Sequence, residues 1–309
     1  MEAAAMVFNK MAEKDSISWN SILSGLVQNG LYEKAFQFLH TMQGAGEKPD
    51  QVSLLSIGMA AGRLGNLSKG KEVHAYAIRA GLEANLNVAN TLMDMYGKCC
   101  CIDYMNLVFD IMTNKDLISW TTIIAGNSQN NYHLRAIELF CRAQGLGIET
   151  DEMMIGSILL ACGGLGIYSL VKEIHGHIVR RGLSDRMLKN SLVAVYGECK
   201  NVDYASRMFH SIQTKDIITW TSMITCFVHN GFASDALKHF RLMEGGVVPD
   251  TIALLSILSA AATLSTLWKG KEIHGFLIRK GFDLEGHLGN TLMDMYAHCG
   301  TVEYSKKGV

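Results

Sequence analysis

KDLISWT, residues 115–121, is the stretch that decides the fold, because closely similar stretches stand about one hundred residues away on either side. KDSISWN occupies residues 14–20, and KDIITWT occupies residues 215–221. The tryptophans in these stretches are 101 and 100 residues apart. A sequence that repeats itself at a fixed period predicts a modular array whose repeats pack on their neighbours, and not a fold built around one active site.

Each period divides into three repeats of unequal length, about 35, 35 and 31 residues, if the chain is cut after the recurring aspartates. The first triplet follows the end of a short repeat, and the third triplet stops inside its short repeat. The predicted boundaries are 1–15; 16–50, 51–85 and 86–116; 117–151, 152–185 and 186–216; and 217–250, 251–285 and 286–309. Because the chain begins inside a repeat and shows no signal or transit peptide at Met1, we expect it to be a fragment.

Every repeat is predicted to contain two helices. In repeat 16–50 the first helix places apolar side chains at helical spacing, namely Trp19, Ile22, Leu23, Leu26 and Val27, and Asn29-Gly30 ends it. The second helix begins near Tyr32 and places Ala35, Phe38, Leu39 and Met42 on one face. One helix pair cannot bury such a stripe, so stacked pairs are expected, which is an all-α fold of the solenoid type.

Composition excludes several functions. The formal net charge of −1 argues against a protein that holds nucleic acid mainly through counterion release, although it leaves base reading open. The eight cysteines contain no Cys-x-x-Cys pair, so buried or half-buried thiols in a reducing compartment are predicted, and no metal site. Two uncharged runs, 153–171 and 251–268, align with 51–69, which carries Arg63, so no membrane span is expected.

The repeat SISWNSILSGLVQNGLYEKAFQFLHTMQGAGEKPD, residues 16–50, resembles a pentatricopeptide repeat. The order of long and short repeats resembles the P, L and S motifs of the plant PLS class. By this resemblance, the P repeats are 16–50, 117–151 and 217–250, and the L repeats are 51–85, 152–185 and 251–285. The S repeats are 86–116 and 186–216, with partial ones at 1–15 and 286–309. GKEVH at 70–74 followed by RAG at 79–81 matches the L motif, and NTLMDMY at 90–96 and 290–296 matches the S motif. The resemblance covers the whole chain and implies a right-handed α-solenoid.

By the same resemblance, each P or S repeat reads one RNA base with its fifth and its last residue. The implied reading pairs are Asn20 with Asp50, Asn90 with Asp116, Thr121 with Asp151, Asn190 with Asp216, and Thr221 with Asp250, while Asn290 has no partner. The apolar second residues Ile17, Ile118, Met187 and Ile218 are implied to lie between successive bases; Asn87 and His287 depart from this pattern. The L repeats carry Leu55 with Asn85, Gly156 with Asp185, and Leu255 with Glu285, and are treated as spacers.

Each of these residues also has a simpler interpretation. An aspartate before a helix is a common N-cap, and an Asn or Thr in the first turn is commonly an exposed polar residue. Five pairs in the same register favour base reading over coincidence. By the family code, Asn with Asp implies U over C and Thr with Asp implies G, so the predicted target is 5′-UnUGnUGnY-3′.

No catalytic function is expected, because the H-x-E and P-C-x-x-C signatures of a zinc deaminase are both absent from the sequence. His74, His175 and His274 recur once per period and are predicted to be packing residues, and no cofactor is implied. The resemblance implies an organellar RNA-editing factor, chloroplastic or alternatively mitochondrial, whose L repeats dock small accessory editing proteins. A protein-binding scaffold of the tetratricopeptide type is the alternative, and self-association through exposed array ends is expected.

Overall fold

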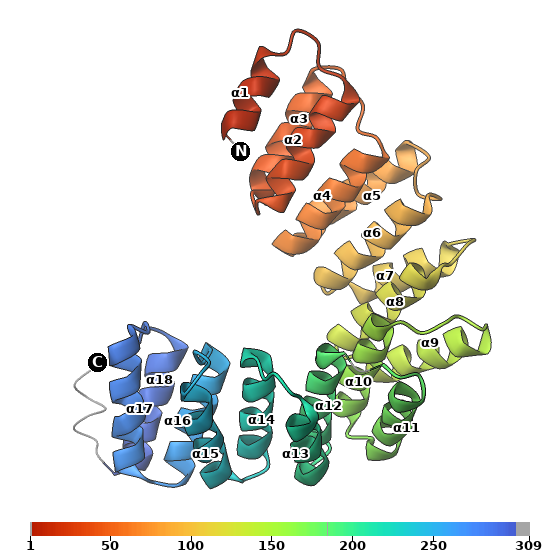
Figure 1. Cartoon of the computed structure of the whole chain (residues 1–309). Helices are drawn as coiled ribbons and strands as arrows, with labels where there is room; N and C mark the ends of the chain where they lie inside the picture. The colour runs from red at the N-terminus through yellow and green to blue at the C-terminus, as the bar shows by residue number, and fades with distance from the viewer. Residues whose placement is uncertain (1, 184, 301–309) are drawn as a thin grey trace. The chain divides into compact units, whose positions relative to one another are not determined.

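The computed structural model describes residues 2–183 and 185–300, which form 18 α-helices and no strand (Figure 1). After a first helix, α1 (Glu2–Lys10), the helices follow one another as antiparallel pairs, and α18 (His287–His298) ends the described part. The pairs are α2 (Ser16–Gln28) with α3 (Tyr32–Gly44), α4 (Gln51–Leu64) with α5 (Leu67–Arg79), α6 (Leu86–Lys98) with α7 (Ile102–Ile111), α8 (Leu117–Gln129) with α9 (His133–Gly145), α10 (Glu152–Leu165) with α11 (Tyr168–Arg180), α12 (Arg186–Glu198) with α13 (Val202–Ser211), α14 (Ile217–His229) with α15 (Ala233–Glu244), and α16 (Thr251–Thr263) with α17 (Leu267–Lys280).

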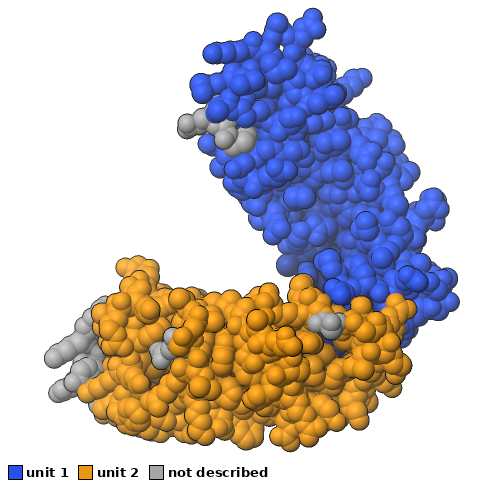
Figure 2. All heavy atoms as spheres, in the orientation of Figure 1, with its two compact units in different colours: residues 1–161 blue, residues 162–309 orange. Residues whose placement is uncertain are grey.

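The chain forms two compact units, residues 1–161 and residues 162–309, and the division falls within α10 (Figure 2). In the first unit the first helices of successive pairs, α2, α4, α6 and α8, pack on one another in order. In the second unit α12, α14, α16 and α18 do the same. Within the units, second helices such as α3, α7 and α15 contact their own first helix and the first helix of the next pair, as α3 contacts α2 and α4. Each unit is therefore a stack of helical hairpins, as the periodicity predicts.

Most first helices begin where an aspartate accepts a hydrogen bond from the backbone of the following turn, whereas α6 is capped by Asn85. Asp50 accepts from the amide of Ser53 at 2.9 Å, and Asp116 accepts from the amide of Ser119 at 2.8 Å. These N-caps satisfy amides that have no partner inside the helix, and each contributes about 1 kcal/mol. At the other end of α2, Gly30 turns the chain with a φ of 73°, which a residue without a Cβ adopts at little cost.

The recurring Lys-Asp-…-Trp stretch joins each long repeat to the short repeat before it. Its tryptophan packs edge-on against a phenylalanine of the preceding helix, with ring centroids 4.8 Å apart for Trp19 and Phe8 and 4.9 Å apart for Trp120 and Phe109. The lysine of the same stretch covers the same ring, since Lys115 Nζ lies 5.0 Å from the centre of Phe109. The conserved spacing between lysine and tryptophan within this chain thus allows both side chains to hold one ring from two sides.

The buried face of α2 is the predicted one, with Trp19, Ile22, Leu23, Leu26 and Val27 all inaccessible. The predicted face of α3 is only partly correct. Ala35 and Met42 are buried, but Phe38 is half-buried and Phe36, which was not predicted, is buried. The reason is that α3 has two apolar sides: Phe38 packs on Phe8, whereas Phe36 faces the following helix pair.

The prediction of buried or half-buried cysteines is wrong for Cys100 and Cys141, whose side chains are exposed. Cys100 stands in the turn after α6 with a φ of 54°, in the left-handed region. Among residues 2–183 and 185–300, no group of His, Cys, Asp or Glu side chains is arranged to hold a metal ion. None of the helices in this part of the chain combines the length and apolarity needed to cross a bilayer.

Candidate nucleic-acid interface

The fifth and last residues of the P and S repeats meet one another. Asn20 Nδ2 lies 3.0 and 2.9 Å from the two carboxylate oxygens of Asp50, and Asn90 Nδ2 lies 3.4 Å from Asp116 Oδ1. In the two repeats with a threonine at the fifth position, the hydroxyl group also faces the last residue. Thr121 Oγ1 is 3.4 Å from Asp151 Oδ1, and Thr221 Oγ1 is 3.1 Å from Asp250 Oδ1. In repeat 186–216, Asn190 and Asp216 share the hydroxyl of Thr219, which is 2.8 Å from an oxygen of each.

The fifth residues are not exposed first-turn side chains, the simpler interpretation considered for them. Asn20, Asn90, Thr121, Asn190 and Thr221 are only 6 to 8% exposed. They lie one turn into the first helix, and α2, α6, α12 and α14 each pack on the first helix of the next repeat. A buried amide or hydroxyl group needs hydrogen-bond partners, and the last residue of the repeat supplies one. Asn290 differs, because its side chain is exposed.

The last residues perform two tasks with one carboxylate. Each of the five aspartates accepts an amide hydrogen bond from the following helix and also faces the fifth residue of its own repeat. At Asp116, burial acts against the charged form, but the amide and hydroxyl of Ser119 and the amide of Asn90 outweigh it, so the pKa of Asp116 lies below its usual value. The N-cap interpretation is thus correct, and it is compatible with base reading.

Sequence reasoning missed a third member of the asparagine sites, a hydroxyl group three residues after each aspartate. Ser53 Oγ donates to Asn20 Oδ1 at 2.6 Å, and Thr219 Oγ1 donates to Asn190 Oδ1 at 2.8 Å. Such a bond directs the amide oxygen toward the hydroxyl and the amide nitrogen toward the carboxylate. In the third asparagine site Ser119 turns to Asp116, and the buried Asn90 Oδ1 is left without a partner among the described residues. The Asp-x-x-Ser/Thr spacing of a capping box was the signal available in the sequence.

The second residues of the first helices are exposed and apolar. The predicted residues Ile17, Ile118, Met187 and Ile218 share this property with three residues of the L repeats that were not predicted, Val52, Met153 and Ile252, and all seven are 47 to 72% exposed. Large apolar side chains in water are unfavourable unless a partner covers them. Their identical register in these seven repeats was the signal that could have included the L repeats.

The L repeats lack the polar contact between fifth and last residue. Leu55, Gly156 and Leu255 have no side-chain polar group to offer. Asn85 instead caps α6 and donates to Gln51, with Nδ2 and Oε1 3.1 Å apart, and Asp185 caps α12 through the amide of Met187. The contact seen at the predicted reading positions is therefore not repeated here, and the role of these repeats as spacers stays a prediction.

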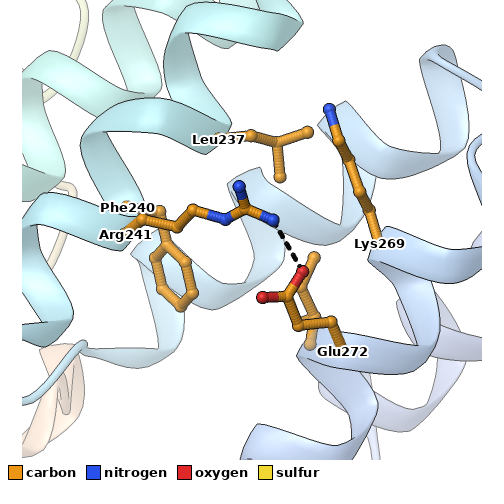
Figure 3. Close-up of a pocket in the computed structure, with 6 residues that line it drawn as sticks. Leu237, Phe240, Arg241, Lys269 and Glu272 are labelled. Carbon is orange, nitrogen blue, oxygen red and sulfur yellow. Dashed lines mark hydrogen bonds and ion pairs between the residues drawn. The ribbon is translucent and has the colours of Figure 1, made fainter.

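The hollow between α15 and α17 does not offer a comparable site. Between α15 and α17, Arg241 and Glu272 form an ion pair 2.8 Å long beside Leu237, Phe240 and Lys269 (Figure 3). The space that they enclose, about 20 Å³, holds about one water molecule.

The histidines that recur once per period are half-buried, and each places Nδ1 2.7 to 2.9 Å from the hydroxyl group of a tyrosine in the next repeat, as His175 does with Tyr196.

Comparison with known proteins finds pentatricopeptide repeats along the chain. The model of the PPR repeat family matches residues 14–56, and the PPR repeat model matches residues 118–148 and 218–246.

Several curated relatives from Arabidopsis thaliana match nearly the whole chain. A chloroplastic pentatricopeptide repeat-containing protein is 50% identical over 307 residues, 99% of this chain and 32% of its own length. A second chloroplastic protein of this kind is 34% identical over 97% of this chain and 37% of its own length. A mitochondrial one is 32% identical over 99% of this chain and 30% of its own length. The chain thus spans about a third of the length of these relatives.

Among solved structures, the pentatricopeptide repeat protein PPR10 in complex with an 18-nt psaJ RNA element matches with a TM-score of 0.81. The match has 18% sequence identity and covers 99% of this chain and 47% of that one. A crystal structure of the pentatricopeptide repeat protein PPR10 from maize matches with a TM-score of 0.71 and covers 97% of this chain and 44% of that one. At this identity the likeness establishes the fold, an α-solenoid of stacked hairpins.

Proposed function

Because the chain is a pentatricopeptide repeat protein, we propose that it binds single-stranded RNA and reads one base with each P or S repeat. The observation that carries the proposal is the recurring contact between the fifth and the last residue in five repeats, beside an exposed apolar second residue. The resemblance to PPR10, which was solved with a bound RNA element, supports the class of ligand.

The asparagine sites have the chemistry to recognise a pyrimidine. One amide hydrogen of Asn20 is directed to Asp50, which leaves the second hydrogen and a lone pair of the amide oxygen for a base edge. Uracil presents a donor at N3 between two carbonyl oxygens, which an amide and a carboxylate can match together. Thr121 and Thr221 are shorter, leave room for a purine, and keep one hydroxyl group for a hydrogen bond.

The exposed second residues supply contact with the faces of the bases. Ile17, Ile118 and Ile218 stand three residues before a reading residue on the same helix, so base edges and base faces are contacted by neighbouring turns. Stacking of this kind tolerates any base and therefore adds affinity without specificity. Val52, Met153 and Ile252 extend this contact to the L repeats, whose bases are otherwise not read.

With the P, L and S order given by the predicted boundaries, the target is 5′-UnUGnUGnY-3′. The N-terminal repeats contact the 5′ end of this RNA, and the C-terminal repeats contact its 3′ end. At about 1 kcal/mol for each of the five pairs, the total of about 5 kcal/mol corresponds to a Kd of about 0.2 mM. A longer array would bind more tightly, and the relatives are about three times as long as this chain.

The cellular role that we propose is positioning of a chloroplast transcript for C-to-U editing. The chloroplastic relatives support this compartment, and the mitochondrial relative marks the alternative. The L repeats 51–85, 152–185 and 251–285 are then free to dock accessory editing proteins, since their fifth and last residues form no reading pair.

The proposal is tested by fluorescence anisotropy with labelled 5′-UAUGAUGAU-3′, titrated with protein up to about 1 mM. Changes of U to G at the third or sixth nucleotide, or of G to A at the fourth or seventh, are expected to reduce affinity, whereas changes at the second, fifth or eighth are expected to be neutral. Equal binding to all sequences, or no binding, would contradict base reading and point to a protein-binding scaffold.

A further inference from the structure

Two repeats carry the same reading pair but differ at the residue that opens the first helix. Repeat 86–116 begins with Leu86 and carries Asn90 and Asp116. Repeat 186–216 begins with Arg186 and carries Asn190 and Asp216. This pair of repeats is therefore a natural comparison in which the reading residues are constant and one neighbour changes from apolar to cationic.

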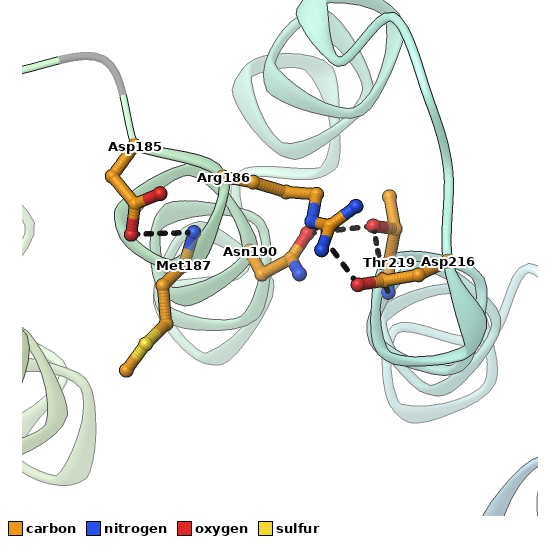
Figure 4. Close-up of polar contacts among 6 residues, drawn as sticks. All are labelled: Asp185, Arg186, Met187, Asn190, Asp216 and Thr219. Atoms are coloured by element: carbon orange, nitrogen blue, oxygen red, sulfur yellow. Dashed lines mark hydrogen bonds and ion pairs between the residues drawn. The ribbon is translucent and has the colours of Figure 1, made fainter.

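Arg186 reaches across its repeat to the reading aspartate. Its Nε lies 3.2 Å from Asp216 Oδ2, and Figure 4 shows the guanidinium group between Asn190 and the carboxylate. The side chain of Arg186 is 52% exposed and that of Asp216 is 29% exposed, so the ion pair lies at the accessible edge of the site. Among the described residues, no other reading aspartate forms an ion pair with a cationic side chain.

The ion pair uses a carboxylate oxygen that is unused in the comparison repeat. Asp216 Oδ1 accepts from the amide and the hydroxyl of Thr219, and Asp216 Oδ2 accepts from Arg186. In Asp116 the hydrogen bonds from Ser119 and Asn90 all end on Oδ1, and Oδ2 has no polar partner within the described part of the chain. Of these two aspartates, Asp116 thus presents an unpaired anionic oxygen at its site and Asp216 does not.

An unpaired carboxylate oxygen distinguishes uracil from cytosine. At N3 uracil carries a hydrogen that a carboxylate accepts directly or through water, whereas cytosine carries a lone pair that a carboxylate repels. A guanidinium group does the opposite, because all of its polar hydrogens are donors and none of its atoms accepts. An arginine on that oxygen therefore removes the feature that favours uracil and offers donors to cytosine.

We propose that Arg186 is a specificity-determining residue that makes repeat 186–216 tolerate cytosine as well as uracil, while repeat 86–116 prefers uracil. The proposal rests on the proposed function, since it concerns which base a reading repeat accepts. In the numbering of the target, Asn90 and Asp116 face the third nucleotide, and Asn190 and Asp216 face the sixth.

The test compares affinities for 5′-UAUGAUGAU-3′ and for versions with U-to-C at the third or the sixth nucleotide. The native chain is expected to lose about threefold to tenfold in affinity at the third nucleotide, the effect of one typical hydrogen bond, and about twofold or less at the sixth. The ratio of the affinity for U to the affinity for C is compared at each of the two nucleotides. Arg186→Leu, which installs the residue of the comparison repeat, is expected to raise this ratio at the sixth nucleotide to its value at the third. Arg186→Lys keeps the charge and is expected to preserve the native ratio. Leu86→Arg is expected to lower the third-nucleotide ratio alone.

Three results separate the possibilities. If Arg186→Leu leaves the sixth-nucleotide ratio unchanged while the third nucleotide still discriminates, the role of Arg186 is overturned and the proposed function stands. The same conclusion follows if Arg186→Leu weakens binding to every RNA equally, because that is the behaviour of a phosphate contact. If the native chain discriminates at no nucleotide, the proposed function itself fails, and this inference fails with it.

Discussion

Asn20 Nδ2 lies within 3.0 Å of both carboxylate oxygens of Asp50, a residue thirty positions further along the chain. Asp50 Oδ1 also accepts the amide hydrogen of Ser53 at 2.9 Å, where α4 begins. Asp50 is thus the last residue of its repeat, and its carboxylate caps the first helix of the next repeat. The same carboxylate also accepts the buried side-chain amide of Asn20. The predicted reading positions are part of the packing, so substitutions there are expected to affect stability as well as base recognition.

Asp50→Ala is expected to reduce the free energy of unfolding by about 2 to 4 kcal/mol, the sum of a lost N-cap and a buried amide left without its partner. Urea unfolding followed by circular dichroism measures the change. Asp110→Ala is the matched control, because Asp110 is exposed near the C-terminal end of α7 and forms no ion pair among the described residues. An equal loss in both variants would contradict a structural role for the Asn20–Asp50 contact.

Thr121→Asn is expected to change the preference of repeat 117–151 from G to U at the fourth nucleotide. The site accepts an asparagine because Asn20 occupies the same position of its own repeat, with similar burial and an aspartate in reach. Anisotropy titrations with G or U at that nucleotide measure the change. Thr122→Asn places the same side chain one residue away from the reading register and is expected to leave the preference for G intact; a shift in both variants would disprove the register.

Stability is expected to fall as the pH decreases from about 7.5 to about 5.5. Burial lowers the pKa of His74, His175 and His274 from the usual 6.5, and the neighbouring Glu83 only partly offsets this at His74. Below about pH 6.5 the unfolded chain therefore binds more protons than the folded chain, which favours unfolding as the pH falls. Above that value the three imidazoles are neutral in both states, and their contribution is constant.

The measurement is the urea midpoint at both pH values, for the native chain and for the triple variant with His74, His175 and His274 changed to Phe. The variant is expected to show a flatter pH dependence than the native chain, because the carboxylates titrate mainly below about pH 5. Identical pH dependence in the two proteins would assign the effect to other groups.

RNA binding is expected to depend weakly on salt. The first helices carry four Lys or Arg residues, Arg63, Lys98, Arg186 and Lys189, and two of these are paired, Lys98 with Asp94 and Arg186 with Asp216. Each phosphate contact to a single strand contributes about −0.7 to the slope of log K against log salt, so a slope shallower than about −2 is expected. A steeper slope would show that binding is dominated by the phosphate backbone.

Self-association of the chain is expected at high concentration, because α1 exposes Met6 and Val7 at 59% and 65%. Light scattering over a range of concentrations measures it, and the double variant Met6→Lys, Val7→Lys is expected to reduce it. Val179→Lys, which changes a side chain 66% exposed on α11, is the control and is expected to leave the association unchanged. A strictly monomeric native chain at all concentrations would contradict the expectation.

Much of the site was visible in the sequence because it lies in register. The five pairs from Asn20 and Asp50 to Thr221 and Asp250 recur at fixed positions of the repeat, and the structure brings the members of each pair close together. Their role in reading bases stays a prediction. Val52 was missed because the L repeats were treated as spacers, and Ser53 was missed because a capping-box serine has a sufficient local explanation without Asn20.

The sequence by itself determined the helix pairs, because apolar periodicity, aspartate N-caps and turn glycines act over a few residues and recur in most repeats. Only the tertiary structure decided which side chains meet between repeats. Asn20 reaches Ser53, and the imidazole of His175 reaches Tyr196, since the offset between stacked helices sets which residues more than twenty positions apart come within hydrogen-bond distance. Arg186 could not be placed on Asp216 from the sequence for the same reason: a long, flexible side chain takes its position from the packing around it.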